Sequence, residues 1–280
     1  MNKKIVISLS VVMASCAASP GPGDEDTGSA SDTAMLTGTV EIARHHGHAR
    51  PLCPGTTPRV HRLSGCGTAT LDGTLSRGEW RRRSSVRFDV NLPGGGTTRA
   101  RMFVMNDATN LYVALRFARA AADPGNSFGL EWDVDHSCGL SNGDDAVVAN
   151  PSVPTIFDDF RTDQPPCPAG SLCGLQDIDA GGTNDGGYAF ANASGFNVYE
   201  ISHPLDSGDT GRDFALHAGD SIGMTTFLRM IGTGGVFPDD FGDTTFPDAG
   251  FVDIRIRACG HRSAADEIDD QDDDGDLDAD

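Results

Sequence analysis

The sequence predicts an all-β protein: an antiparallel β-sandwich of the two-sheet kind (jelly-roll or immunoglobulin-like), folded as a single domain over residues 64–262. Three observations predict it. Apolar and polar residues alternate in short runs, which is typical of strands that bury one face. Glycine, proline, asparagine and aspartate separate these runs, as they do at turns. No internal repeat divides the stretch, so about ten such strands suit one sandwich.

Residues 1–15 have the pattern of an export signal. Two lysines precede an apolar run that is too short to span a bilayer. The next residues, Met13-Ala14-Ser15-Cys16, resemble the lipobox of bacterial lipoproteins, which implies cleavage before Cys16 and acyl chains on Cys16. Because Ala17 is not acidic, we expect an outer-membrane lipid anchor, with the protein facing the periplasm or the cell surface. The alternative is a secreted protein, cleaved by general signal peptidase near residues 14–18.

Residues 16–63 have the composition of a disordered linker. Small and polar residues predominate, and few large apolar side chains could offset the entropy of ordering. His45, His46 and His48 could bind a transition metal, but three histidines on a flexible segment lack a fixed fourth ligand. A solvated linker is the simpler interpretation.

The chain is strongly acidic. It has 41 Asp and Glu against 21 Lys and Arg, a net charge of −20. Both lysines lie in the export signal, so the mature chain has 19 arginines and a net charge of 19 − 41 = −22. Such a chain repels polyanions, which excludes nucleic acid and anionic lipid surfaces as partners. We therefore expect contact with the membrane only through the lipid anchor, and cations as the more natural ligands.

Four runs show the alternation most clearly, and each is expected to bury one face. Their inward positions are Leu111, Val113, Leu115 and Phe117; Phe128, Leu130 and Trp132; Ile222, Met224, Thr226 and Leu228; and Val252, Ile254, Ile256 and Ala258. Residues 150–195 and 232–250 are rich in proline, glycine and aspartate. We expect these two stretches to be long loops, which are often functional or held by cross-links.

Six cysteines remain once Cys16 is lipidated, and an even number in an exported chain predicts a set of disulfides. They are Cys53, Cys66, Cys138, Cys167, Cys173 and Cys259. Cys167 and Cys173 form the local pair that we expect first, whereas the sequence leaves the other pairings open. A metal site is the competing interpretation, but no Cys-x-x-Cys or paired Cys/His spacing supports it.

Five phrases in a fixed order resemble one protein family. They are Leu71-Asp72-Gly73, Gly78-Glu79-Trp80, residues 105–114, Trp132-Asp133-Val134-Asp135 with Gly143-Asp144-Asp145, and residues 199–205. Together they are similar to family 9 carbohydrate-binding modules and their DOMON-like relatives. The resemblance implies an antiparallel β-sandwich that binds sugars, with calcium as a common structural ion. Other relatives bind haem or serve as interaction modules. The resemblance therefore supports the fold of this chain more strongly than its ligand, because function resides in the site.

Sugar binding needs a flat aromatic face beside hydrogen-bonding side chains. Trp80 lies at the family's structural position and Trp132 shares a strand face with apolar residues, so we expect both in the core. The remaining candidates lie in the second predicted loop, where phenylalanines alternate with aspartates. They are Phe237, Asp239, Asp240, Phe241, Asp243 and Phe246. Phenylalanines packed over the end of the sandwich, with solvated acids around them, are the alternative.

Two acidic segments are candidate calcium sites, because calcium collects several oxygens and clustered aspartates supply them. The first consists of Asp133, Asp135, Asp144 and Asp145. The second lies in the acidic tail, residues 263–280, where Asp270, Asp272, Asp274 and Asp276 match the start of an EF-hand-type loop. For the first segment, the alternative is an acidic loop whose charge is balanced by nearby arginines. For the second, it is a solvated tail that binds no ion.

The sequence contains no pattern that points to a particular catalytic site. It has no His-Glu-x-x-His motif and no phosphate-binding loop, and no pair stands out among its 41 acids as the carboxylates of a glycosidase. We therefore expect a protein that binds and does not catalyse. The leading hypothesis is calcium-assisted glycan binding at the cell envelope. The alternative is a calcium-dependent adhesion or scaffold protein that binds a cell-surface protein.

Overall fold

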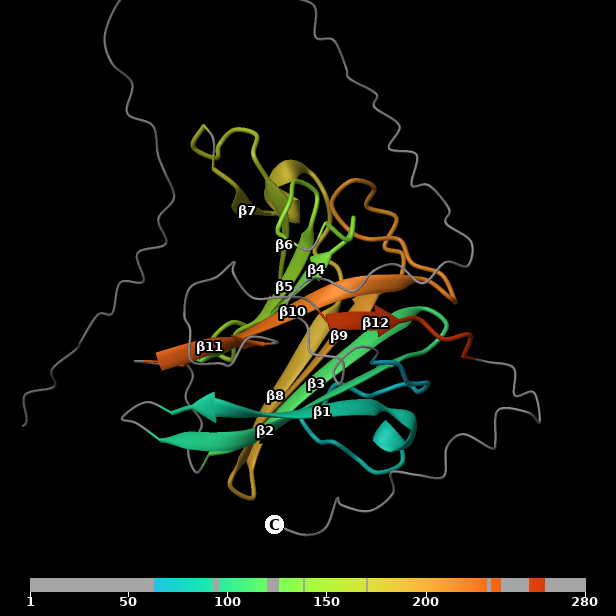
Figure 1. The fold of residues 1–280 in the computed structure, drawn as a ribbon, viewed down its shortest axis with the longest axis vertical. Coiled ribbons are helices and arrows are strands. Elements are labelled where there is room, and N and C mark those ends of the chain that lie inside the picture. Colours follow the sequence, from blue (N-terminus) through green and yellow to red (C-terminus); the bar gives the residue numbers. More distant parts are fainter. Residues whose placement is uncertain are drawn as a thin grey trace, which may run out of the picture. The chain divides into compact units, whose positions relative to one another are not determined.

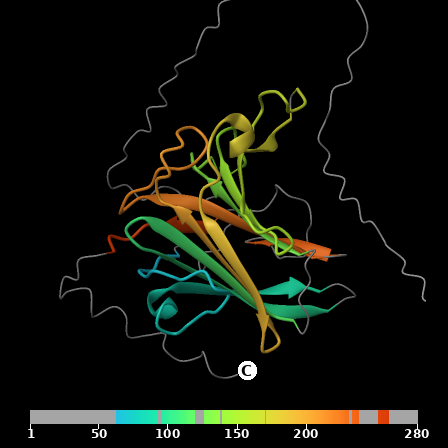
Figure 2. The same cartoon turned by 180° about the vertical axis from the view of Figure 1, so that it is seen from behind.

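The structure is a computed structural model that describes residues 63–92, 96–119, 126–137, 139–169, 171–230, 233–237 and 252–259, with only the backbone of Asn91, Met230 and residues 233–237. The described residues form two antiparallel β-sheets that pack face to face, as Figure 1 and the reverse view in Figure 2 show. The predicted all-β antiparallel sandwich is confirmed. It has twelve strands in the described part of the chain, where the sequence indicated about ten.

The smaller sheet has five strands in the order β1-β2-β3-β9-β8, and each neighbouring pair is antiparallel. Its strands are β1 (Ser84–Asn91), β2 (Thr97–Asn106), β3 (Asn110–Ala118), β8 (Gly187–Ala193) and β9 (Phe196–Pro204). The three strands of residues 84–118 form a meander, and the β8–β9 hairpin joins it through β3.

The larger sheet has seven strands, six of them in the order β11-β10-β4-β5-β6-β7. These are β4 (Ser127–Asp133), β5 (Asp145–Ala149), β6 (Phe157–Thr162), β7 (Cys173–Gln176), β10 (Ser221–Met230) and β11 (Thr233–Phe237). The seventh, β12 (Val252–Arg255), pairs with the first half of β10, while β11 pairs with the second half. Two short 3-10 helices, η1 (Trp80–Arg82) and η2 (Asp177–Ala180), are the only helical turns among the described residues.

The main core fills the space between the two sheets. All seven inward positions predicted for β3 and β4 are fully buried there: Leu111, Val113, Leu115, Phe117, Phe128, Leu130 and Trp132. Trp132 is thus a core residue, as expected. Because side chains alternate across a strand, this inner face also determines where the polar residues at the strand ends point.

A second, smaller core covers the outer face of β2 and β3. Tyr112 and Ala114 lie on that face and are buried, although the alternation predicted that β3 would bury one face only. The prediction was wrong because the segment before β1 folds back over the sheet. Trp80 of η1 packs there, 6.1 Å from the ring of Phe103 between centroids.

Glu200 anchors this covering segment. One carboxylate oxygen accepts a hydrogen bond from the indole N–H of Trp80 (3.0 Å), and the other accepts the backbone N–H groups of Asp72 (3.1 Å) and Gly73 (2.7 Å). Gly73 has φ +79°, and a Cβ at this position would lie 2.6 Å from the Cβ of Ala191. Glycine is therefore required both for the turn and for the close approach to β8.

Asp107 shapes the turn between β2 and β3. Its carboxylate accepts hydrogen bonds from the backbone N–H groups of Thr109 (2.8 Å) and Asn110 (2.7 Å) and from the hydroxyls of Tyr112 (2.8 Å) and Thr68 (3.1 Å). Burial by itself would raise the pKa of Asp107, but these hydrogen bonds outweigh it and the pKa is lowered.

Residues 150–195 are not the long loop that their composition indicated. The stretch contains β6, β7, η2 and β8. The alternation is weak here because several inward positions of β6 are polar and lie beyond the apolar core. Within the described residues, no helix has the length and apolar character needed to span a bilayer.

Two disulfides lie in the described part of the chain. Cys167–Cys173 is the local pair that the sequence favoured, and Cys66–Cys259 joins residues 193 positions apart. The remaining cysteines, Cys16, Cys53 and Cys138, lie outside the described residues, so the lipidation of Cys16 stays a prediction.

Candidate functional site

The loop between β4 and β5 brings three of the four predicted calcium ligands together. Asp133, Asp135 and Asp144 each place a carboxylate oxygen within 4.8 Å of the others, so this group could hold a metal ion. It offers oxygen donors only, which is the ligand type that calcium prefers. These carboxylates also accept hydrogen bonds from the loop itself, including Ser137 N–H to Asp133 (2.8 Å) and Ser141 N–H to Asp144 (2.6 Å).

Two acids of this group, the buried Asp144 and the exposed Asp135, differ in their pKa shifts. Burial raises the pKa of Asp144 to about 6, against the hydrogen bonds from the backbone of Ser141 and Val134. For Asp135, burial acts in the same direction, but hydrogen bonds from Ser137 and Ser141 outweigh it and the pKa is lowered.

Asp145, the fourth predicted ligand, does not belong to this loop cluster. It begins β5, where Val147 and Ala149 point into the core, so the side chain of Asp145 points inward as well. Asp144, one residue earlier, points to the other side. Asp144 and Asp145 were predicted to bind the same ion because they are adjacent in the sequence. In the structure their side chains point to opposite faces of the sheet.

Asp145 instead forms a buried cluster at one end of the space between the sheets. The Nε2 atom of His203 lies 3.7 Å from a carboxylate oxygen of Asp145, 3.8 Å from one of Asp158 and 3.9 Å from one of Asp213. Each of these four side chains is at most 1% exposed. We call Asp145, Asp158, His203 and Asp213 the inner cluster; it too has the geometry of a group that could hold a metal ion.

Four different elements supply the inner cluster. Asp145 comes from β5 and Asp158 from β6 of the larger sheet, and His203 lies near the end of β9 in the smaller sheet. Asp213 comes from the connection between β9 and β10. On β9, Tyr199 and Ile201 point into the core, so His203 continues the inward row at the strand's end.

Apolar packing encloses the inner cluster on the core side. The ring of Phe214 lies 4.6 Å from the imidazole of His203 and 5.4 Å from the ring of Trp132. These aromatic rings exclude water from one side of the carboxylates, which makes their charges costly.

The polar atoms of the inner cluster are poorly satisfied by the described residues. His203 Nε2, Asp158 Oδ1 and both carboxylate oxygens of Asp145 and of Asp213 lack a hydrogen bond of ordinary geometry. The imidazole Nδ1 lies 2.8 Å from the carbonyl oxygen of Pro204. A carbonyl oxygen only accepts, so Nδ1 carries the proton and Nε2 directs a lone pair toward the three carboxylates.

The pKa values of these groups reflect their burial. Burial and the charges of Asp158 and Asp213 raise the pKa of Asp145 well above its usual value, and burial raises that of Asp158 to about 8. The neighbouring Asp177 of η2 has its pKa raised to about 9 by burial and by the charge of Asp158. The pKa of His203 is lowered, chiefly by burial. Without a cation, the site therefore favours protonated carboxyls and a neutral imidazole.

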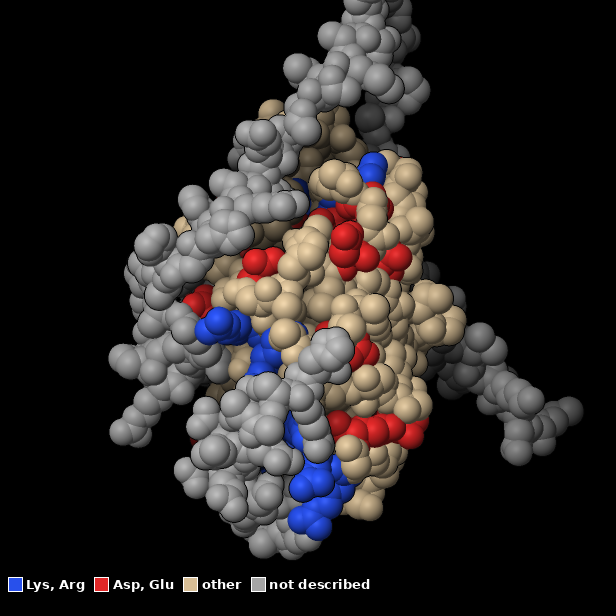
Figure 3. All heavy atoms as spheres, turned by 90° about the vertical axis from the view of Figure 1, so that its right-hand side faces the viewer, with Lys and Arg blue, Asp and Glu red and all other residues tan. Residues whose placement is uncertain are grey.

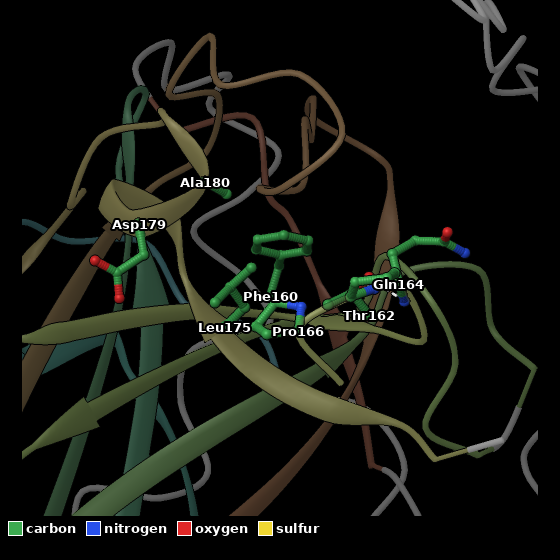
Figure 4. Close-up of a pocket in the computed structure, with 8 residues that line it drawn as sticks. Phe160, Thr162, Gln164, Pro166, Leu175, Asp179 and Ala180 are labelled. Atoms are coloured by element: carbon green, nitrogen blue, oxygen red, sulfur yellow. Dashed lines mark hydrogen bonds between the residues drawn. The ribbon is translucent and has the colours of Figure 1, made fainter. Parts of the chain in front are cut away.

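A pocket opens beside the inner cluster, with a volume of about 560 Å³, a size common for small-molecule sites. Phe160 lies two residues after Asp158 on β6, so both side chains are on the inner face. In Figure 4 the Phe160 ring lies at the centre of the pocket, with Leu175 and Pro166 on one side and Ala180 on the other. The helix η2 takes part in both sites, because Asp177 is buried at the inner cluster and Asp179 lines the pocket.

Polar side chains frame this aromatic surface. Asp179 and Gln164 lie at opposite ends of the pocket in Figure 4, and Thr162 lies between Gln164 and the ring. The hydroxyl of Thr162 accepts the backbone N–H of Gln164 at 3.1 Å. The pocket therefore combines an apolar floor with carboxylate, amide and hydroxyl groups.

Charge is unevenly distributed on the face drawn in Figure 3. Acidic side chains lie mostly in its upper half, and arginines gather near the bottom. In Figure 1, β6, β7 and η2 also lie in the upper part of the molecule.

The predicted ligand-binding loop is almost wholly outside the described residues. Phe237 ends β11, where its backbone pairs with Thr226, and its side chain is not described. Asp239, Asp240, Phe241, Asp243 and Phe246 lie outside the description, as do the tail residues Asp270, Asp272, Asp274 and Asp276. All of these stay predictions.

Sequence reasoning did not find Asp158, Asp213, His203 or the pocket around Phe160. His203 carried a usable signal, because it continues the inward alternation of Tyr199 and Ile201 and a histidine there must be buried. Asp213 carried none, since it lies in an irregular connection.

The sequence also matches Gly-x-Ser-x-Gly twice, at residues 139–143 and 219–223. That motif marks a nucleophile only on a sharp turn from a strand into a helix. The first match lies in the β4–β5 loop, and the second enters β10 directly. Neither has the required context.

Comparison with known proteins found no matching protein-family profile and no matching curated protein. Among solved structures, a carbohydrate binding module family 9 (CBM9) from Caldicellulosiruptor kristjanssonii in complex with glucose is similar to this chain, with a TM-score of 0.44 and 11% identity over 72% of this chain and 98% of that one. A second CBM9 structure from that organism, in complex with cellotriose, has a TM-score of 0.44 and 12% identity over 71% of this chain and 94% of that one.

Proposed function

We propose that this protein is a non-catalytic lipoprotein of the cell envelope that binds a glycan in the pocket around Phe160, with calcium bound by the β4–β5 loop. The pocket is the observation that carries the proposal. It presents one aromatic ring and four further apolar residues, Pro165, Pro166, Leu175 and Ala180, among polar side chains.

The chemistry of this pocket suits a sugar ring. The C–H groups of a pyranose pack against an aromatic face, and its hydroxyls need hydrogen-bond donors and acceptors around the edge. Phe160 supplies the face, while Asp179, Gln164 and Thr162 supply acceptors and donors at its rim. The phrases that resemble family 9 carbohydrate-binding modules support the same ligand class.

Calcium has a defined place in this proposal. Asp133, Asp135 and Asp144 offer oxygen donors from one loop. The same loop is hydrogen-bonded to β6, because the backbone N–H of Arg161 donates to the carbonyl of Asp144 at 2.6 Å and that of Gly143 donates to the carbonyl of Arg161 at 2.7 Å. An ion that orders the loop would therefore also steady the strand that carries Phe160.

The test begins with a glycan array and continues with calorimetry on the glycan that binds best. We expect Phe160→Ala to weaken binding about tenfold or more, which corresponds to about 1.4 kcal/mol. Phe157→Ala is the matched control, because Phe157 lies on the same strand but on the opposite face. Phe237→Ala and Phe241→Ala test whether the predicted loop contributes contacts as well.

Two results would overturn this assignment. Equal losses of glycan affinity from Phe160→Ala and Phe157→Ala would show that the pocket is not the binding site. A blank array, combined with calcium-dependent capture of a cell-surface protein, would favour adhesion or scaffolding over glycan binding. The lipid anchor is tested separately by whether Cys16→Ala releases the protein from the membrane fraction.

A further inference from the structure

We infer that the inner cluster binds one divalent first-row transition-metal ion, such as zinc or manganese, and that this ion ties the two sheets together. The ligands are His203, Asp145, Asp158 and Asp213. The inference is independent of the proposed glycan and of calcium in the β4–β5 loop, since it concerns different atoms.

The spacing of the donors leaves room for an ion. The three carboxylate oxygens lie 3.7, 3.8 and 3.9 Å from His203 Nε2, which is too far for hydrogen bonds. In a tetrahedral shell the ligand–ligand distance is about 1.6 times the metal–ligand distance, so 3.8 Å corresponds to about 2.3 Å. Zinc binds nitrogen and oxygen at about 2.0–2.2 Å, so the three nitrogen–oxygen distances need only a small contraction. The carboxylate oxygens lie within 4.8 Å of one another.

The donor set selects the class of metal. Calcium and magnesium take oxygen ligands, whereas imidazole suits zinc and other first-row transition metals. The Nδ1–H of His203 donates to the carbonyl of Pro204, which fixes the tautomer with Nε2 free to coordinate. Metal-binding histidines are commonly held by such a hydrogen bond to a carbonyl oxygen.

Asp158 is held in a comparable way. Its Oδ2 accepts the backbone N–H of Asp185 at 2.6 Å, which leaves Oδ1 facing His203. A ligand oxygen whose partner oxygen is fixed by the backbone needs little reorganisation to coordinate a metal.

Among the described residues, no other cation pairs with these carboxylates. The only lysines of the sequence, Lys3 and Lys4, lie outside this part of the chain. Within the described residues, the ion pairs of Asp145, Asp158 and Asp213 are with His203 alone, and none is with arginine. Buried acids are normally paired or metal-bound, because an isolated buried carboxylate is costly. A divalent ion with three carboxylates and a neutral imidazole would leave a net charge of −1 at the site.

The ligands come from both layers of the sandwich. Asp145 and Asp158 belong to the larger sheet, His203 to the smaller one, and Asp213 to the β9–β10 connection. A metal at their centre would cross-link the sheets at the end beside the pocket. Metal binding should therefore raise the thermal stability of the whole domain, because the ion binds the folded state in preference.

The experiment uses the mature full-length chain in which His45, His46, His48 and His61 are replaced by glutamine, so that the linker histidines cannot bind the probe. Metal content is measured by mass spectrometry after purification and again after chelation. Zinc, manganese and calcium salts are then titrated separately into the chelated protein, with calorimetry and thermal unfolding as readouts. We expect one zinc or manganese per chain, a lower Tm after chelation, and recovery when either ion is restored.

His203→Gln should weaken zinc or manganese binding at least 100-fold and abolish the rise in Tm. His217→Gln is the matched control, because the His217 side chain is 78% exposed and lies outside the cluster. It should bind as the parent does. Asp213→Asn provides a second ligand variant from a loop, where misfolding is less expected than on a strand.

A readout on the parent protein keeps the test decisive if the ligand variants do not fold. Cobalt loaded at one equivalent should show visible absorption of a nitrogen- and oxygen-ligated site of low coordination number, and zinc should displace it. The inference is overturned if the chelated parent binds neither zinc nor manganese, if it binds calcium alone, or if folded His203→Gln binds zinc as the parent does.

Discussion

The two disulfides make a quantitative prediction about stability, because they close loops of very different size. Cys66–Cys259 spans 193 positions of the chain, whereas Cys167–Cys173 spans 6. A cross-link stabilises the folded state largely by restricting the unfolded chain, and the restriction grows with the logarithm of loop length. Removing the long-range bridge should therefore cost more than removing the local one.

The chain-entropy relation gives the magnitudes. For a loop of 193 residues it predicts a loss of about 5 kcal/mol, and for one of 6 residues about 2 kcal/mol. For a domain of this size, 1 kcal/mol corresponds to roughly 2–4 °C in Tm. The expected decreases are thus roughly 10–20 °C for the long-range bridge and roughly 4–8 °C for the local one.

The assay is urea unfolding, followed by circular dichroism and tryptophan fluorescence. It compares the parent with the double variants Cys66→Ser/Cys259→Ser and Cys167→Ser/Cys173→Ser, which keep all other cysteines. The denaturant slope should also rise for the long-loop variant, because its unfolded chain exposes more surface. Equal losses of stability within about 1 kcal/mol, or a larger loss from the local bridge, would refute the reasoning from loop length.

Other substitutions test the outer-face core and the β2–β3 turn. Glu200→Gln should cost about 2 kcal/mol in urea unfolding, because at least one of the N–H groups of Trp80, Asp72 and Gly73 then loses its buried acceptor; an unchanged midpoint would contradict this. Asp89→Asn is the surface control for these variants. It should cost less than about 0.5 kcal/mol, because the ion pair of Asp89 with Arg99 is mostly exposed, and a larger loss would contradict this. The lowered pKa of Asp107 stabilises the fold above the ordinary value of 3.8 and ceases to do so as pH falls through the folded value. The difference in unfolding free energy between the parent and Asp107→Asn should therefore be widest near neutral pH and shrink in acid. A difference that grows in acid would contradict the lowered pKa of Asp107.

The central strands were predictable because alternation is a local property. Phe128, Leu130 and Trp132 show it without any knowledge of their partners, and the structure buries all three. The outer face of β3 was not predictable in this way. Tyr112 is buried because Trp80, more than thirty positions earlier, folds over it, and no local pattern records such a long-range contact.

The site shows the same division between local and long-range information. Acidic residues close in sequence pointed to the β4–β5 loop, where Asp133 and Asp144 do lie together. The inner cluster joins residues from positions 145 to 213 across two sheets, so only the fold could assemble it. β6 was overlooked for a related reason, since Asp158 occupies an inward position where an apolar residue would have marked a strand.

The first and last described segments of the chain meet at the edge of the fold. Leu63 pairs with Ile254, and the Cα atoms of Cys66 and Cys259 are 5.5 Å apart. The sandwich is therefore nearly circular in its connectivity. A permuted gene that opens at the Ser194-Gly195 turn, with a short bridge between the old ends, would encode the same set of neighbouring strands.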